Sequence, residues 1–144
     1  MEIDLTKYLS REFEIAIEGM RDSSLNPHQR MYYMSATFGA ISRVLNIDYN
    51  KELVLAHLIL QTCHQTTMAL MNNCLNGSEK SIVFNPILID SLSDLIEELG
   101  ENLVAGESIY NQALSIAEVT YSMTGNGHYL FRKDIIKLPS PKNH

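Results

Sequence analysis

The sequence contains no tryptophan, only two cysteines and four prolines, and fewer basic than acidic residues. Two cysteines in 144 residues exclude a small scaffold held together by disulfides, and the low proline and glycine counts exclude a collagen-like chain. The 11 basic and 17 acidic residues give a formal charge of −6, which disfavours a general nucleic-acid-binding domain. A hydrophobic fraction of 45% is too high for a disordered chain. We therefore expect an acidic protein with a single globular domain.

The two cysteines also indicate a compartment. Cys63 and Cys74 lie in one predicted helix, where eleven residues span about 16 Å. A disulfide requires Cα atoms within about 7 Å, so the two thiols cannot pair while this helix is intact. The N-terminus is charged and lacks the apolar core of a secretion signal. Free thiols and the absence of such a signal predict a cytoplasmic protein.

Residues 53–78 contain no charged side chain, which raises the question of a membrane span. Glutamine, threonine, histidine and asparagine interrupt this stretch too often for a helix that faces lipid. Its first half, LVLAHLIL, is apolar on every side and therefore predicts burial on every side. We expect a central helix over residues 51–76, enclosed by protein, and no contact with a membrane.

Helical periodicity dominates the rest of the chain, and no strand pattern is present. Asp4 and Asn26-Pro27 are typical helix starts, and Asp48 or Asn50 can cap the central helix. The segment 78–84 is predicted as a linker before a fourth helix that starts at Asn85-Pro86 and ends or bends at Gly100. A fifth helix is expected over about 107–123. The prediction is an all-α, single-domain bundle of about five helices over residues 1–127, followed by a C-terminal extended arm, residues 128–144, with disordered last residues.

The central helix carries an unusual polar patch. Because buried amides and hydroxyls need partners, the patch could form a symmetric helix–helix interface, line a ligand pocket, or face solvent. The two histidines lie about 10 Å apart along the helix, too far to bind one metal ion together, so no metal is expected. The candidate ligand or interface residues are His57, Gln61, Cys63, His64 and Thr67.

Carboxylates at helical spacing form a second candidate site. Glu14 and Glu18 share one face of the first helix, and Asp94 and Glu97 share one face of the fourth. Magnesium-dependent all-α nucleotide pyrophosphohydrolases use such spacings, because Mg²⁺ prefers carboxylate oxygens together with phosphate. The chain lacks the second motif of these enzymes and a basic cluster for phosphate, so we do not assign it to them. No other nucleophile or phosphate-binding motif occurs, and no catalytic residue or cofactor is assigned.

Charge is distributed unevenly toward the C-terminus. No lysine or arginine occurs between Lys80 and Arg132, whereas seven acidic residues do. The C-terminal arm then carries Arg132, Lys133, Lys137 and Lys142 against a single acidic residue. We expect the arm to dock on the acidic fourth and fifth helices, either of its own chain or of a second subunit.

Taken together, these patterns predict a non-enzymatic, homo-oligomeric interaction or regulatory module. Apolar residues on more than one face of the second and third helices favour a homodimer, with a further protein partner that the sequence does not identify. A magnesium-dependent nucleotide hydrolase using the helix carboxylates is the first alternative. A small-ligand sensor that binds at the His57–Thr67 patch is the second. Nucleic acid is not an expected partner.

Overall fold

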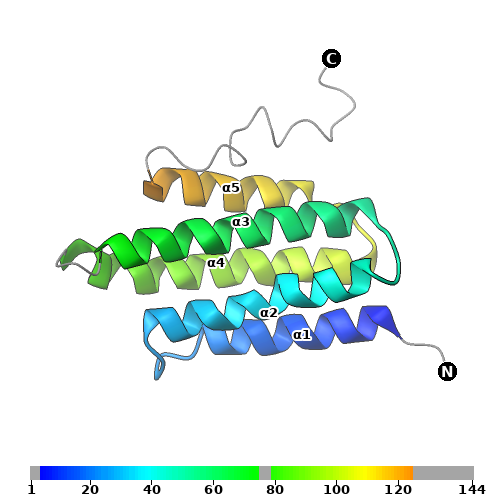
Figure 1. The fold of residues 1–144 in the computed structure, drawn as a ribbon, viewed down its shortest axis with the longest axis horizontal. Helices are drawn as coiled ribbons and strands as arrows, with labels where there is room; N and C mark the ends of the chain where they lie inside the picture. Colours follow the sequence, from blue (N-terminus) through cyan, green and yellow to red (C-terminus); the bar gives the residue numbers. More distant parts are fainter. Residues whose placement is uncertain (1–3, 75–78, 125–144) are drawn as a thin grey trace, which may run out of the picture.

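The protein folds as a bundle of helices in a computed structural model that describes residues 4–74 and 79–124 (Figure 1). The predicted all-α architecture with five helices is confirmed, and these ranges contain no strand. The predicted C-terminal arm and the domain boundary at residue 127 lie outside the described residues. The helices are α1 (Leu5–Met20), α2 (Pro27–Leu45), α3 (Lys51–Cys74), α4 (Glu79–Ala105) and α5 (Tyr110–Thr124).

Side-chain caps fix the first three helix starts where the sequence predicts them. The Asp4 carboxylate accepts a hydrogen bond from the backbone N–H of Lys7 at 3.0 Å. Asn26 and Gln29 form a reciprocal capping box in front of α2, with a proline at its first position. Asn50 accepts hydrogen bonds from two N–H groups of the first turn of α3. These caps satisfy helix N–H groups that have no partner within the helix.

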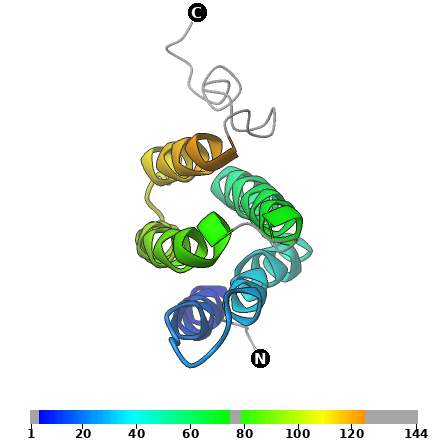
Figure 2. The ribbon, with the colours of Figure 1, turned by 90° about the vertical axis from the view of Figure 1, so that its left-hand side faces the viewer.

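Consecutive helices run in opposite directions, and α1 to α4 form a four-helix arrangement in which α1 packs against α4 (Figures 1 and 2). Helix α5 packs over α3 and α4, on the side of the bundle away from α1. Helix α3 contacts α2, α4 and α5, whereas α4 contacts all four other helices. The core is continuous through the bundle, because buried side chains from every helix belong to one cluster.

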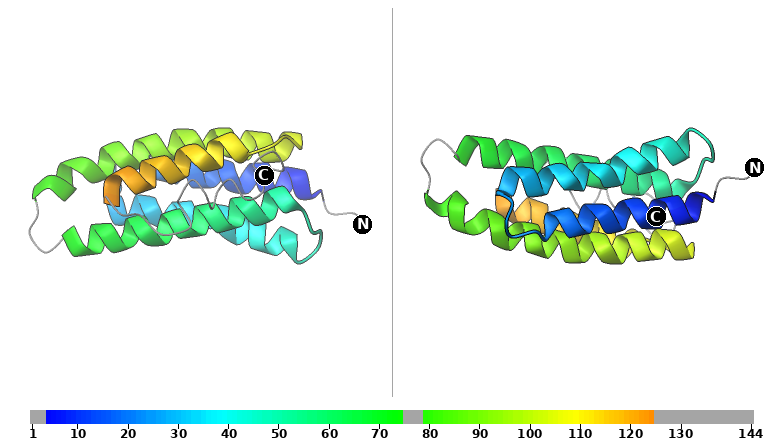
Figure 3. Two further views of the ribbon diagram at one scale, coloured as in Figure 1. Left: turned by 90° about the horizontal axis from the view of Figure 1, so that it is seen from above. Right: turned by 90° about the horizontal axis from the view of Figure 1, so that it is seen from below.

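Helix α3 has one exposed stripe, contrary to the expectation that it would be buried on every side. Ala56 and Leu60 are fully buried, but Val54 and Leu58 are 40% and 41% exposed. Helices α2, α4 and α5 pack against α3 (Figure 3), but the exposures of Val54 and Leu58 show that they leave this face partly open. Apolar residues on a helix face therefore do not by themselves imply burial. Over the described part of the chain, no helix is both long enough and apolar enough to cross a bilayer.

Helix α4 is longer than predicted at both ends. It begins at Glu79, so the expected linker over 78–84 is wrong for residues 79–84, and Asn85-Pro86 lies inside the helix. A proline inside a helix removes one backbone hydrogen bond and crowds the carbonyl four residues earlier, but α4 extends through it, so the Asn-Pro start signal does not decide where this helix begins. The helix also continues through Gly100 and ends before Gly106, whose φ of 73° is a left-handed conformation that favours glycine.

Gly100 serves close packing rather than helix termination. A Cβ atom at this position would lie 2.5 Å from Cδ2 of Phe13, whose ring is buried between α1 and α4. Glycine therefore allows α1 and α4 to approach closely, and this approach places the ring of Phe13 at the bottom of the surface described below.

Candidate functional site

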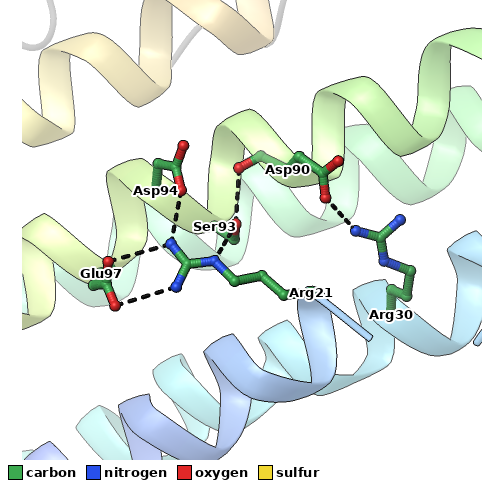
Figure 4. Close-up of polar contacts among 6 residues, drawn as sticks. All are labelled: Arg21, Arg30, Asp90, Ser93, Asp94 and Glu97. Carbon is green, nitrogen blue, oxygen red and sulfur yellow. Dashed lines mark hydrogen bonds and ion pairs between the residues drawn. The ribbon is translucent and has the colours of Figure 1, made fainter. Parts of the chain in front are cut away.

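Arg21, at the C-terminal end of α1, binds a row of oxygen atoms on α4 (Figure 4). Its guanidinium contacts Asp94 at 2.7 Å and donates two hydrogen bonds of 3.2 Å to Glu97. Its Nε donates a further hydrogen bond to the Ser93 hydroxyl at 3.1 Å. The hydrogen bond to Glu97 is the main reason that the pKa of Arg21 is raised. Two of the four predicted carboxylates are therefore partnered by an arginine.

A second arginine, Arg30 of α2, connects three helices (Figure 4). Its side chain is almost completely buried, and its Nε donates a hydrogen bond of 2.5 Å to the carbonyl oxygen of Met20 at the end of α1. Its Nη2 pairs with the carboxylate of Asp90 on α4. Arg30 has a structural position, because it satisfies a helix-end carbonyl and holds α1, α2 and α4 together.

An open groove of about 980 Å³ lies between α1 and α4. Its floor is apolar and contains Phe13 and Ile17 from α1 and Val104 from α4. Its rims carry exposed carboxylates, and among the residues that the structure describes Arg21 is the one cation that lines it. We call it the acidic groove; its lining residues are Ser10, Phe13, Glu14, Ile17, Glu18, Arg21, Glu97, Gly100, Glu101, Val104 and Ala105.

The acidic groove brings together three of the four predicted carboxylates. Glu14, Glu18 and Glu97 line it, whereas Asp94 is not among its lining residues and contacts Arg21. Glu101, one turn after Glu97, joins them. Neither Glu14, Glu18 nor Glu101 forms an ion pair or a side-chain hydrogen bond with any residue that the structure describes. The groove thus has a surplus of negative charge beyond what Arg21 neutralises.

Phe13, Arg21 and Glu101 also line the acidic groove, although none of them was predicted as a site residue. An acidic line on α4, formed by Asp90, Asp94, Glu97 and Glu101 at helical spacing, is visible in the sequence, but the register of α1 on α4 decides which of these residues face the groove. Within residues 4–74 and 79–124, no group of three or more histidine, cysteine, aspartate or glutamate side chains is arranged to hold a metal ion. The groove carboxylates therefore form two rims rather than one coordination cluster.

The residues of the polar patch predicted on α3 contact two different helices, α2 and α5. Cys63 and Thr67 are buried, and the Cys63 sulfur accepts a hydrogen bond from the Thr120 hydroxyl of α5 at 3.2 Å. Thr67 lies 3.9 Å from the same sulfur. Gln61 is half-buried, as are His57 and His64, which lie against α2. These five residues do not face a common space.

Burial raises the pKa of the Cys63 thiol to about 11. Because the thiolate is the reactive form, Cys63 should resist alkylation while the protein is folded. In a Cys74→Ser variant, which keeps Cys63 as its one thiol, we expect iodoacetamide to react at pH 8 at a rate limited by unfolding. Mass spectrometry measures this rate, and adding denaturant should accelerate it strongly. Rapid labelling of the native variant would contradict the buried position of Cys63.

His64 contacts the backbone of α2 and lies beside an aromatic ring. Its Nε2 lies 3.0 Å from the carbonyl oxygen of Met31, and because a carbonyl only accepts, this nitrogen carries the proton. The Phe38 ring packs edge-on against it, with centroids 5.3 Å apart, and also contacts His57 at 6.3 Å. Burial lowers the pKa of His64, although the hydrogen bond to Met31 opposes this effect.

The lowered pKa of His64 predicts that stability depends on pH. The unfolded chain binds a proton near pH 6.5, whereas the folded chain binds it only at lower pH. The stability contributed by neutral His64 is therefore fully present above pH 6.5 and is lost as the pH falls through the folded pKa. We expect the unfolding free energy to fall between pH 7.5 and 5, and to fall less in a His64→Gln variant, whose amide can still donate to Met31. Urea titrations of both proteins over this pH range measure the unfolding free energy. If it falls equally with pH in both proteins, the assignment to His64 is wrong.

Comparisons with known proteins add no family to these observations: no protein-family model matches the chain, and no curated protein or solved structure is significantly similar to it.

Proposed function

We propose that this protein is a non-enzymatic interaction module that binds a cationic, amphipathic segment of a protein partner in the acidic groove. The observation that carries this proposal is the combination of an apolar floor with three rim carboxylates, Glu14, Glu18 and Glu101, that lack cationic partners among the described residues. A helix or extended segment with apolar residues on one side and lysine or arginine on the other would match both parts of the groove. Apolar burial would supply affinity, and the charges would fix orientation and selectivity.

A direct test uses a labelled amphipathic helix of about 18 residues, built from leucine and lysine, as the probe. Fluorescence anisotropy measures its binding to the full chain, and the same helix with glutamate in place of lysine is the control peptide. We expect the lysine peptide to bind, with an affinity that decreases as salt is added, and the glutamate peptide not to bind. Equal binding of both peptides would contradict recognition by the groove.

Matched protein variants locate the binding surface. Glu14→Lys combined with Glu101→Lys reverses one carboxylate on each rim and should weaken binding at least about tenfold, because two exposed attractions become repulsions. Asp48→Lys combined with Glu98→Lys changes the net charge by the same amount outside the groove, since neither residue lines it. This control variant should bind almost as well as the wild type. A similar loss in both variants would show that net charge, not the groove, governs binding.

Self-association is the second part of the proposal. Of the seven large hydrophobic side chains that are exposed in the described part of the chain, four lie in the α2–α3 turn and the first turns of α3. Val54 and Leu58 share one face of α3, at a spacing of four residues. A homodimer that covers this face would explain its apolar character. Light scattering should give a dimeric mass, and Val54→Glu with Leu58→Glu should give a monomer; a monomeric wild type would remove this part of the proposal.

A magnesium-dependent nucleotide hydrolase is the second candidate, and the gathering of Glu14, Glu18 and Glu97 along one groove favours it. Against the hydrolase, Arg21 already forms ion pairs with Glu97 and Asp94. A thermal-shift screen with Mg²⁺ and nucleoside triphosphates separates the two functions. A hydrolase predicts that Mg²⁺ and a nucleotide together raise the melting temperature, whereas the interaction module predicts no such shift. The proposed sensor site at His57–Thr67 has no comparable support, because its residues face different neighbours.

A further inference from the structure

The chain itself contains a segment whose chemistry matches the acidic groove. The C-terminal arm has four basic residues and one acidic residue, and six apolar side chains lie before, between and directly after the first three of these bases. The rims of the groove carry Glu14, Glu18 and Glu101 without cationic partners in the described part of the chain. These apolar residues of the arm are Tyr129, Leu130, Phe131, Ile135, Ile136 and Leu138, and its bases are Arg132, Lys133, Lys137 and Lys142.

The arm follows a helix that packs on α4, and α4 forms one rim of the groove. This helix, α5, ends at Thr124. Figure 2 shows α4 between α5 and α1 on one side of the bundle. Helix α4, with 27 residues, is about 40 Å long at 1.5 Å per residue. Arg132 and Lys137 follow Thr124 by 8 and 13 residues, so an extended chain carries them up to about 26 and 43 Å from the end of α5.

We infer that the C-terminal arm occupies the acidic groove of its own chain and competes there with the cationic segment of a partner. The inference rests on the proposed function, because it assigns a second occupant to the same surface. It places the arm between α1 and α4, instead of on α4 and α5 as the sequence suggested. A tethered segment has an effective concentration in the millimolar range, so modest contacts suffice to occupy the groove in the same chain. A partner segment must then bind the groove strongly enough to displace the arm.

The position of the arm is tested in the full chain with a spin label. Ser140→Cys in a Cys74→Ser background gives one reactive site just beyond the apolar part of the arm, because Cys63 is buried. We expect paramagnetic broadening of the amide signals of Glu14 and Glu101, and little at Tyr32 or Leu58, which are exposed and do not line the groove. High salt, or Glu14→Lys with Glu101→Lys, should remove the broadening. Even broadening over the bundle, or broadening centred on another face, would overturn the inference.

Mixed samples separate the same chain from a second copy. When a spin-labelled protein without ¹⁵N is mixed with a ¹⁵N-labelled protein without the spin label, an arm that occupies its own groove gives no broadening. Broadening of the groove signals in this mixture would show that the arm reaches a second copy, and would overturn the assignment to its own chain.

Competition with the lysine–leucine peptide distinguishes failure of this inference from failure of the proposed function. Arg132→Glu, Lys133→Glu and Lys137→Glu together should release the arm and strengthen peptide binding about tenfold, because the free fraction of the groove increases. Glutamate on the arm could also attract the peptide, so Arg132→Gln, Lys133→Gln and Lys137→Gln should show the same direction. Peptide binding that is unchanged in the glutamine variant overturns the role of the arm and leaves the proposed function intact. No peptide binding to any variant overturns the proposed function.

Discussion

Replacing Ile96 with alanine is expected to lower the free energy of unfolding by about 2–5 kcal/mol, the range for a buried large-to-small substitution. Ile96 is fully buried on α4, the helix that contacts all four others. Truncation would remove apolar contacts and leave a cavity where the surrounding helices cannot fully close. Chemical denaturation followed by circular dichroism measures the change.

The matched control is Ile15→Ala, the same substitution at a side chain of α1 that is 44% exposed. It should cost about 1 kcal/mol or less, because much of the side chain is in water in both states. Equal losses at Ile96 and Ile15 would contradict the burial of Ile96 in the core of the bundle.

The second large effect is expected from Arg30→Ala, which should destabilise the protein by about 2–3 kcal/mol. The substitution leaves the carbonyl oxygen of Met20 without its donor and removes a buried stem that packs between three helices. The loss is smaller than for a fully buried ion pair, because Asp90 is 65% exposed and regains water when its partner is removed. Thermal and denaturant unfolding measure it.

Arg43→Ala provides the comparison on the same helix. Arg43 is 65% exposed, and its contacts are a hydrogen bond to the Tyr8 hydroxyl and a 3.9 Å approach to Glu12. Its replacement should cost about 0–1 kcal/mol, as for an exposed ion pair. If Arg43→Ala lowers the unfolding free energy as much as Arg30→Ala does, the burial of Arg30 does not explain its effect on stability.

Much of the fold could be predicted from local sequence, because caps and apolar spacing act within a few residues. Asp4, Asn26 and Asn50 cap helices where predicted, and the all-α architecture follows from the periodicity. The start of α4 could not be predicted, since Pro86 is a helix-start signal that tertiary packing overrides. Nor could the exposed stripe at Val54 and Leu58, because hydropathy alone does not say which neighbours cover a face.

The candidate site, like the fold, could be predicted only in part from the sequence. The spacing of Glu14 and Glu18, and the acidic line on α4, were visible as patterns on separate helices. Their meeting in one groove depends on how α1 lies against α4, which the close approach of Phe13 to Gly100 fixes. The ion pair between Arg21 and Asp94 depends on where α1 ends relative to α4. Such registers arise from packing between segments more than seventy residues apart, which periodicity does not report.

A charge-swap experiment tests the acidic groove as the binding surface most directly. Anisotropy titrations would combine the wild type and the Glu14→Lys, Glu101→Lys variant with the lysine peptide and the glutamate peptide. The account predicts binding for the two pairs of opposite charge, so the variant should lose the lysine peptide and gain the glutamate peptide. If the variant binds the lysine peptide as tightly as the wild type does and gains no affinity for the glutamate peptide, the groove is not the binding surface.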